Sequence, residues 1–215
     1  MVDEQPDDSK LSDLAKILTV DLWGSDATAV KNALDRLGAL CENERIKEIQ
    51  SHGGHMGLVV ILRKWSTSAP VQAAALNCLH KAAESLEFCQ AVASLGALDL
   101  VLVALRNHPR NEAVATAGCG ALLNLTLPEE NARELVFHLR GIPTICATCA
   151  NFSQTIVLQK YVLWLIQYMS YWDNFKGPIV QDGGLHALAE IIERFSDGSQ
   201  DALVKSARAT MQRLL

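Results

Sequence analysis

One pattern recurs about every 43 residues along this 215-residue chain, and it limits the fold more than any other feature. A glycine followed by the apolar start of a helix occurs at Gly54, Gly96, Gly141 and Gly184, at intervals of 42, 45 and 43 residues. A period of this length is typical of stacked repeat proteins, in which each unit packs only against its neighbours. The chain is therefore expected to form a solenoid with a core that runs along its length.

A second, independent marker gives the same period. Two apolar residues three positions apart recur at intervals of 42, 46, 41 and 48 residues, as Leu34/Leu37, Leu76/Leu79, Leu122/Leu125, Leu163/Ile166 and Met211/Leu214. This spacing places both residues on one face of a helix. Because no segment shows the two-residue alternation of a β-strand, an all-α fold is predicted.

Each unit is predicted to contain three helices. A short helix such as 129–139 leads into the glycine, which suits a left-handed helix cap, and a second helix follows. A polar turn then leads into a longer third helix, predicted at 71–83, 113–125, 156–172 and 202–215. The units are placed at 11–43, 44–85, 86–127, 128–172 and 173–215, the first without its short helix, after an acidic and flexible segment at 1–10.

This organisation resembles the armadillo repeat. The resemblance covers residues 11–215 and is carried by Gly-Ile-Pro-Thr-Ile at 141–145, Gly-Ala-Leu at 96–98 and Ala-Leu-Leu-Asn-Leu at 121–125, which is similar to the family's third-helix signature. HEAT repeats are the nearest alternative. The resemblance implies an all-α, right-handed superhelix of about five armadillo-like repeats. It also implies that the third helices line a concave groove, which in this family usually holds an extended peptide.

The polar ladder of such grooves is nearly absent here. In importin alpha and beta-catenin, Asn residues on the third helices bind the backbone of the peptide, and this chain keeps one of them, Asn124. The matching positions are held by Arg36, Cys78, Leu165 and Arg213. The resemblance therefore implies a peptide groove without the importin mechanism, in which Asn124 and Arg36 offer polar contacts.

Aromatic residues gather in the third helix of the fourth unit. Tyr161, Leu165, Tyr168 and Trp172 share one helix face, which by alignment with Asn124 faces the groove. Aromatic side chains with a polar tip carry much of the binding energy at protein interfaces. Two interpretations are open, because the face is either an interaction patch or a surface that packs against neighbouring repeats.

Two glycines lie inside the predicted helix 113–125. Gly118 and Gly120 each cost about 1 kcal/mol of helix stability relative to alanine, so a compensating role is expected. Gly120 either leaves room for Tyr161 or a ligand to approach the backbone, or it permits close packing between third helices.

No motif for catalysis, a cofactor or a metal is evident. Cys146 and Cys149 have the spacing of a redox or metal half-site, but no second pair completes a zinc site. His52 and His55 flank a glycine turn and form no ligand set. The chain carries no phosphate-binding loop and no nucleophile motif, so neither an enzyme nor a cofactor is expected.

Charge and hydropathy narrow the class of partner. Lys and Arg number 19 against 24 Asp and Glu, a net charge of −5, so nucleic acid is not an expected partner. The apolar runs are much shorter than the roughly 20 residues of a membrane helix, so no membrane insertion is expected. The acidic start lacks the pattern of a secretory signal, so a cytoplasmic location is expected, with the nucleus as an alternative.

Taken together, these features predict a protein–protein interaction scaffold or adaptor that binds a protein or extended peptide in the concave groove. The alternative is a structural assembly or regulatory subunit module that docks through its convex or end surfaces. Self-association through the repeat ends belongs to that alternative.

Overall fold

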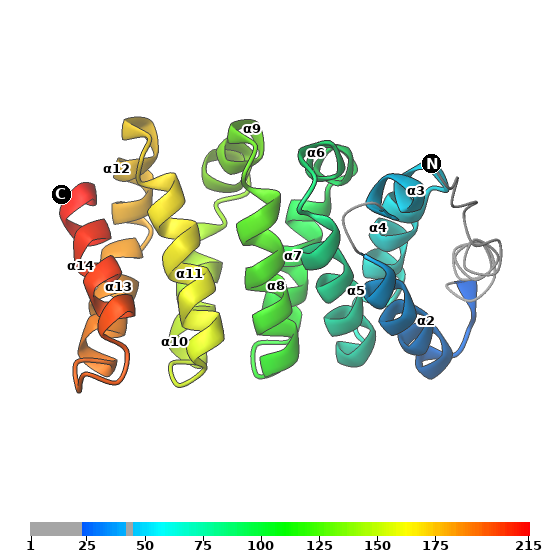
Figure 1. Ribbon diagram of the computed structural model, residues 1–215, viewed down its shortest axis with the longest axis horizontal. Helices are drawn as coiled ribbons and strands as arrows, with labels where there is room; N and C mark the ends of the chain where they lie inside the picture. The colour runs from blue at the N-terminus through cyan, green and yellow to red at the C-terminus, as the bar shows by residue number, and fades with distance from the viewer. Residues whose placement is uncertain (1–22, 42–44) are drawn as a thin grey trace, which may run out of the picture.

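The computed structural model describes residues 23–41 and 45–215, and these residues form helices without any strand. The helices follow one another in groups of three from one end of the molecule to the other (Figure 1). The prediction of an all-α solenoid is confirmed. Residues 1–10, predicted to be a flexible acidic segment, and the predicted start of the first unit at 11–22 lie outside the described residues.

The longest helix of each group, called here the third helix, lies beside the third helix of the next group (Figure 1). The third helices are α2 (Ala27–Leu40), α5 (Ala69–Ala82), α8 (Glu112–Leu125), α11 (Ile156–Met169) and α14 (Asp201–Leu214). The second helices form a neighbouring row: α4 (Gly54–Lys64), α7 (Ala97–Asn107), α10 (Ile142–Asn151) and α13 (Gly184–Arg194).

The short first helices run along the upper edge in Figure 1. They are α3 (Arg45–Ser51), α6 (Leu86–Ser94), α9 (Glu129–Arg133), which continues into the π-helix η2 (Glu134–His138), and α12 (Asp173–Gln181). Among the described residues no single helix is long and apolar enough to span a bilayer; α6 and α7 reach the required length only together, across a bend of 74°.

The hydrophobic core contains the recurring apolar pairs of the third helices. In the units with third helices α5, α8 and α11, both members of each pair are completely buried. Phe88 of α6 and Phe175 of α12 are the bulkiest of the fully buried side chains, and each anchors a first helix against its unit. Burial of apolar surface therefore extends continuously from unit to unit, as expected for stacked repeats.

The turn between first and second helices uses one left-handed residue in each described unit. In three units this residue is a glycine with φ between 76° and 99°, namely Gly53, Gly96 and Gly183. In the fourth unit it is Arg140, with φ 49°. The prediction of a left-handed glycine cap is confirmed for Gly96. It is wrong for Gly54, Gly141 and Gly184, because in each of these units the left-handed residue is the one before the predicted glycine.

A π-helix precedes the turn of the fourth unit and lengthens the spacing of the left-handed positions by one residue. The backbone amide of Leu139 donates to the carbonyl of Glu134, five residues earlier, and a π turn of this kind adds one residue to a helix. The left-handed positions are accordingly 43, 44 and 43 residues apart. Gly141 is needed for space instead, since a Cβ there would lie 2.5 Å from Cδ1 of Leu135.

The third helix of the fourth unit is shorter than predicted. It ends at Met169 instead of continuing to residue 172. Trp172 has an extended backbone, with φ −102° and ψ 123°, and it precedes the first residue of α12. The position of its ring is therefore set by the turn between α11 and α12, and Trp172 does not lie on a face of α11.

Candidate functional site: the face of the third helices

A hollow of about 540 Å³ crosses the exposed faces of α2, α5 and α8 and reaches Tyr161 of α11. Small side chains make this space, because alanines and a proline of α5 and alanines of α8 are six of its thirteen lining residues. Its polar groups are Asn77, His80, Asn111 and Thr116, together with the ion-paired Lys31 and Asp35 of α2. The groove predicted along the third helices is therefore present as a real depression in this part of the molecule.

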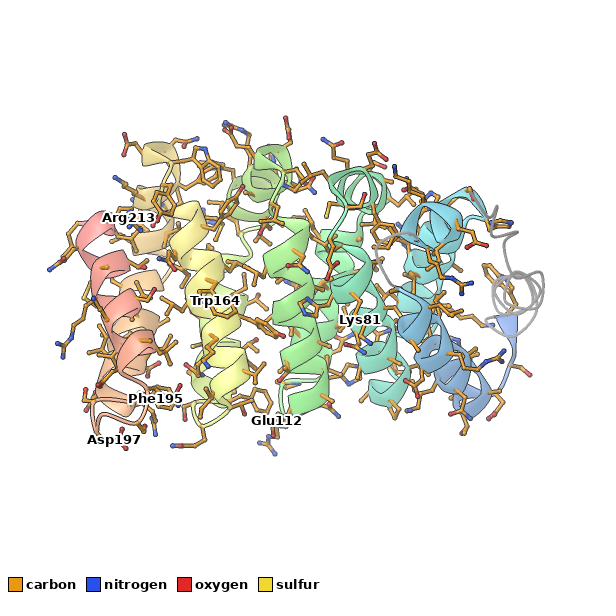
Figure 2. All side chains as sticks on the ribbon, in the orientation of Figure 1. Lys81, Glu112, Trp164, Phe195, Asp197 and Arg213 are labelled. Carbon is orange, nitrogen blue, oxygen red and sulfur yellow. The ribbon has the colours of Figure 1, made fainter. Side chains whose placement is uncertain are left out.

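Beside this hollow, α11 and the turn after it present large side chains to solvent. Val157 and Trp164 of α11 are 50% and 45% exposed, and their spacing of seven residues places them on one face of the helix. Tyr171, in the turn that follows α11, is 62% exposed. Figure 2 shows Trp164 in the middle of α11. We call these three residues the α11 stripe; Tyr171 is also covered on one side by the guanidinium of Arg213, 4.1 Å from its ring centre.

Tyrosines flank the α11 stripe on the side of α8. The Tyr161 hydroxyl lies 3.4 Å from Nε2 of His80, and the Tyr168 hydroxyl donates to the carbonyl of Leu127 at 2.5 Å. Trp172 packs edge-on against Tyr168, with ring centres 4.7 Å apart. The packing interpretation therefore describes these three rings, and the interaction patch stays a prediction.

Leu165 does not lie on this face. It is 1% exposed and belongs to the core, so its predicted place beside Tyr161 and Tyr168 is wrong. Trp164, one residue earlier, occupies the exposed position instead. The cause is the alignment with Asn124, which was taken to point into the groove.

The side chain at the position of Asn124 contacts the preceding unit in α5, α8 and α14 and does not line the hollow. The Asn124 side-chain amide donates to the carbonyl of His80 at 2.8 Å, and the Cys78 thiol donates to the carbonyl of Leu34 at 3.0 Å. Arg213 similarly donates to the hydroxyl of Ser170. This position therefore joins neighbouring units. Arg36, the other predicted polar contact, is exposed on α2, where the hollow itself is lined by Lys31 and Asp35.

The space beside Gly120 is filled by the ring of His80. A Cβ at Gly120 would lie 3.0 to 3.1 Å from three atoms of that ring, and one at Gly118 would lie 2.8 Å from Cδ2 of Leu105. The ring of His80 is in turn in contact with Tyr161, with ring centres 5.2 Å apart. Gly120 thus allows close packing between the third helices α8 and α5, the second of the two roles expected for it, whereas Gly118 allows close packing of α8 against α7.

The cysteines have the environment of structural thiols. Cys149 donates to Oε1 of Gln159 at 3.0 Å, and burial raises the pKa values of Cys146 and Cys149 to about 12. His52 bonds through Nδ1 to the carbonyl of Glu48. Within residues 23–41 and 45–215, no three His, Cys, Asp or Glu side chains are grouped so that they could hold a metal ion.

Thiol reactivity tests this environment. Desolvation raises the pKa of all six cysteines, so at pH 8 the reactive thiolate is scarcer than for a free cysteine. We expect the native protein to react with a thiol reagent much more slowly than the urea-unfolded chain, in which all six become accessible. A rapid stoichiometric reaction of Cys146 or Cys149 in the native protein, located by mass spectrometry, would contradict this.

Comparison with known proteins supports the same architecture. No family model matches the chain, and no curated protein matches it in sequence. Among solved structures, a computationally designed armadillo repeat protein for modular peptide recognition has a TM-score of 0.81 at 18% identity, covering 95% of this chain and 83% of its own. A second designed armadillo repeat protein has a TM-score of 0.75 at 17% identity, covering 94% of this chain and 100% of its own.

An engineered protein is also similar, with a TM-score of 0.76 at 21% identity, covering 94% of this chain and 96% of its own. These structures match nearly the whole chain, and the two that are named for their repeats are armadillo repeat proteins. The chain therefore has an armadillo-like repeat fold, an all-α solenoid of stacked three-helix units.

Proposed function

We propose that this protein is a binding scaffold that holds an extended segment of another protein along the face of its third helices. The observation that carries the proposal is the α11 stripe, which keeps Val157, Trp164 and Tyr171 in solvent beside the hollow. Aligned exposed apolar side chains of this size mark interaction sites in soluble proteins. The designed neighbour named for modular peptide recognition supports a peptide as the partner.

The apolar and the polar groups of this surface suit the side chains and the backbone of a bound segment, respectively. Apolar side chains of the segment enter the alanine-lined hollow and pack on Trp164, where burial in water-excluded contacts supplies most of the affinity. Asn77 and Thr116 offer hydrogen bonds to its backbone from within the hollow. Because Asn124 is engaged by His80, these groups replace the ladder of the importin type.

Peptide selection tests this function. A phage library of random peptides of about 12 residues suits the surface, because third-helix axes about 10 Å apart and an extended rise of about 3.3 Å per residue match that length. Affinities of selected peptides are measured by fluorescence anisotropy. Trp164→Ser/Tyr171→Ser should weaken binding by about 30-fold, the effect of losing one central aromatic contact.

A matched control removes exposed apolar side chains from the row of second helices. Met56 and Val60 of α4 are 52% and 38% exposed, and Met56→Ser/Val60→Ser should leave peptide affinity unchanged. Circular dichroism and thermal melts show that both double variants are folded. Failure to select any peptide, or a loss of affinity in the α4 variant alone, would contradict the proposal; the latter result would place binding on the convex surface.

A further inference from the structure

Charge is distributed unevenly between the third helices and the rest of the chain. The helices α2, α5, α8, α11 and α14 contain seven Lys or Arg residues and three Asp or Glu residues, a net charge of +4. The whole chain has a net charge of −5. The face proposed to bind a partner is thus positively charged on an acidic protein, which favours a negatively charged ligand.

The positive charge lies next to the α11 stripe. Gln167 of α11 accepts a hydrogen bond from Ser206 of α14 at 3.2 Å, and this contact fixes the side of α11 that faces α14. Lys160 lies on that same side of α11, seven residues before Gln167. Lys205, next to Ser206, is exposed on α14. Arg208 is two residues from Ser206 and therefore lies on the side of α14 turned away from α11. Trp164 thus has Lys160 beside it on the side of α14, and Lys205 is exposed on the next third helix.

These cations are not neutralised within the described part of the chain. Seven ion pairs are formed there, and neither Lys160 nor Lys205 belongs to any of them. In α2, by contrast, Lys31 is paired with Asp35. Asp201, in the first turn of α14, lines the same pocket as Lys205 but forms no ion pair with it. The strip between α11 and α14 thus keeps a net positive charge for an external anion.

We propose that the occupant of the groove is an acidic segment of a partner protein, with an apolar side chain packed on Trp164 and carboxylates on Lys160 and Lys205. This rests on the proposed function and adds the chemical class of the partner. We expect an acidic residue to lie beside the apolar one in the sequence of the segment, because Lys160 precedes Trp164 by about one helical turn. Long-range attraction between the segment and this strip speeds association and favours acidic over basic segments.

Three fluorescein-labelled peptides of about 12 residues test the proposal, a length chosen to cross the third helices. The first contains glutamate and serine around a central leucine, the second has lysine in place of each glutamate, and the third has serine in place of the leucine. The first should bind best, the second should not bind measurably, and the third should bind weakly. Binding of the first should weaken as salt rises, because salt screens exposed charges.

Charge reversal locates the contact. Lys160→Glu/Lys205→Glu should weaken binding of the first peptide by roughly tenfold or more at low salt, since both attractions become repulsions. The matched control, Lys47→Glu/Arg110→Glu, makes the same change in net charge at exposed positions outside the third helices, and it should change affinity much less. Equal losses in both double variants would overturn the proposal, because they would mean that only net charge matters.

The outcomes separate this proposal from the proposed function. No binding of the glutamate–leucine peptide, or equal or tighter binding of the lysine peptide, overturns the acidic class of partner. If phage selection still yields basic or neutral peptides whose binding needs Trp164, the scaffold function stands and only the acidic class of partner is wrong. If selection yields no peptide at all and the glutamate–leucine peptide also fails to bind, both proposals are wrong.

Discussion

Phe175→Ala should destabilise the protein by about 3–5 kcal/mol, the usual cost of removing a buried phenylalanine side chain. Phe175 is completely buried, and its ring lies 5.4 Å from that of Trp172 and 5.6 Å from that of Phe137, measured between ring centres. It therefore joins α12 to the fourth unit through η2 and the turn after α11. Removing it leaves a cavity where the last unit meets its neighbour.

Urea denaturation measures this loss, and hydrogen exchange shows where it acts. In a stacked repeat protein, coupling runs between neighbouring units, so the amides of α12, α13 and α14 should lose protection first. Leu86→Ala on α6 is the control, because Leu86 is 58% exposed and should cost no more than about 0.5 kcal/mol. Equal stability of the Phe175 variant and the Leu86 variant would contradict this account of the core.

Gly120→Leu should destabilise the protein by about 1–3 kcal/mol through overpacking between α5 and α8. The leucine needs the space that the ring of His80 occupies, so the ring must leave its contacts with Asn124 and Tyr161. Gly120→Ala is the graded control. The alanine Cβ requires only a slight shift of the flexible His80 side chain, and alanine stabilises the helix by about 1 kcal/mol relative to glycine. We therefore expect only a small net change in the free energy of unfolding.

A double variant shows whether His80 is the cause. His80→Ala removes the ring that collides with the new leucine, so His80→Ala/Gly120→Leu should be more stable than the sum of the two single changes predicts. Thermal or urea unfolding of the four proteins gives this coupling. Additive changes would mean that the cost of the leucine comes from contacts other than His80.

The solenoid could be predicted from the sequence because the apolar residues that recur with the period of the repeat are also the residues that form the core. The apolar pairs at Leu76/Leu79 and Leu122/Leu125 mark the buried face of each third helix, and a glycine marks each turn. The π-helix was missed because Glu134–His138 contains neither glycine nor proline and keeps an apolar pattern. The one added residue lengthens the spacing of the left-handed positions from 43 to 44 residues, so that Arg140 occupies the left-handed position.

The exposed face of α11 was predicted one residue out of register, with Leu165 in the place that Trp164 occupies. Leu158, Val162, Leu165 and Met169 have the three-and-four spacing of a buried face, and Val157 and Trp164 have a spacing of seven on the opposite side. This periodicity within α11 could have excluded Leu165. The role of His80 could not have been found in the same way, because it depends on a contact between units 40 residues apart, Gly120 with His80.

The central claim, that the face of the third helices binds the partner, is tested most directly by the tryptophan side chains. In a ¹⁵N-labelled protein, the indole signal of Trp164 reports on α11, and that of Trp65 at the end of α4 reports on the second helices. Titration with a selected peptide should shift the Trp164 signal and leave Trp65 unchanged. A shift of Trp65 with an unmoved Trp164, together with amide shifts along α4, α7 and α10, would contradict the account.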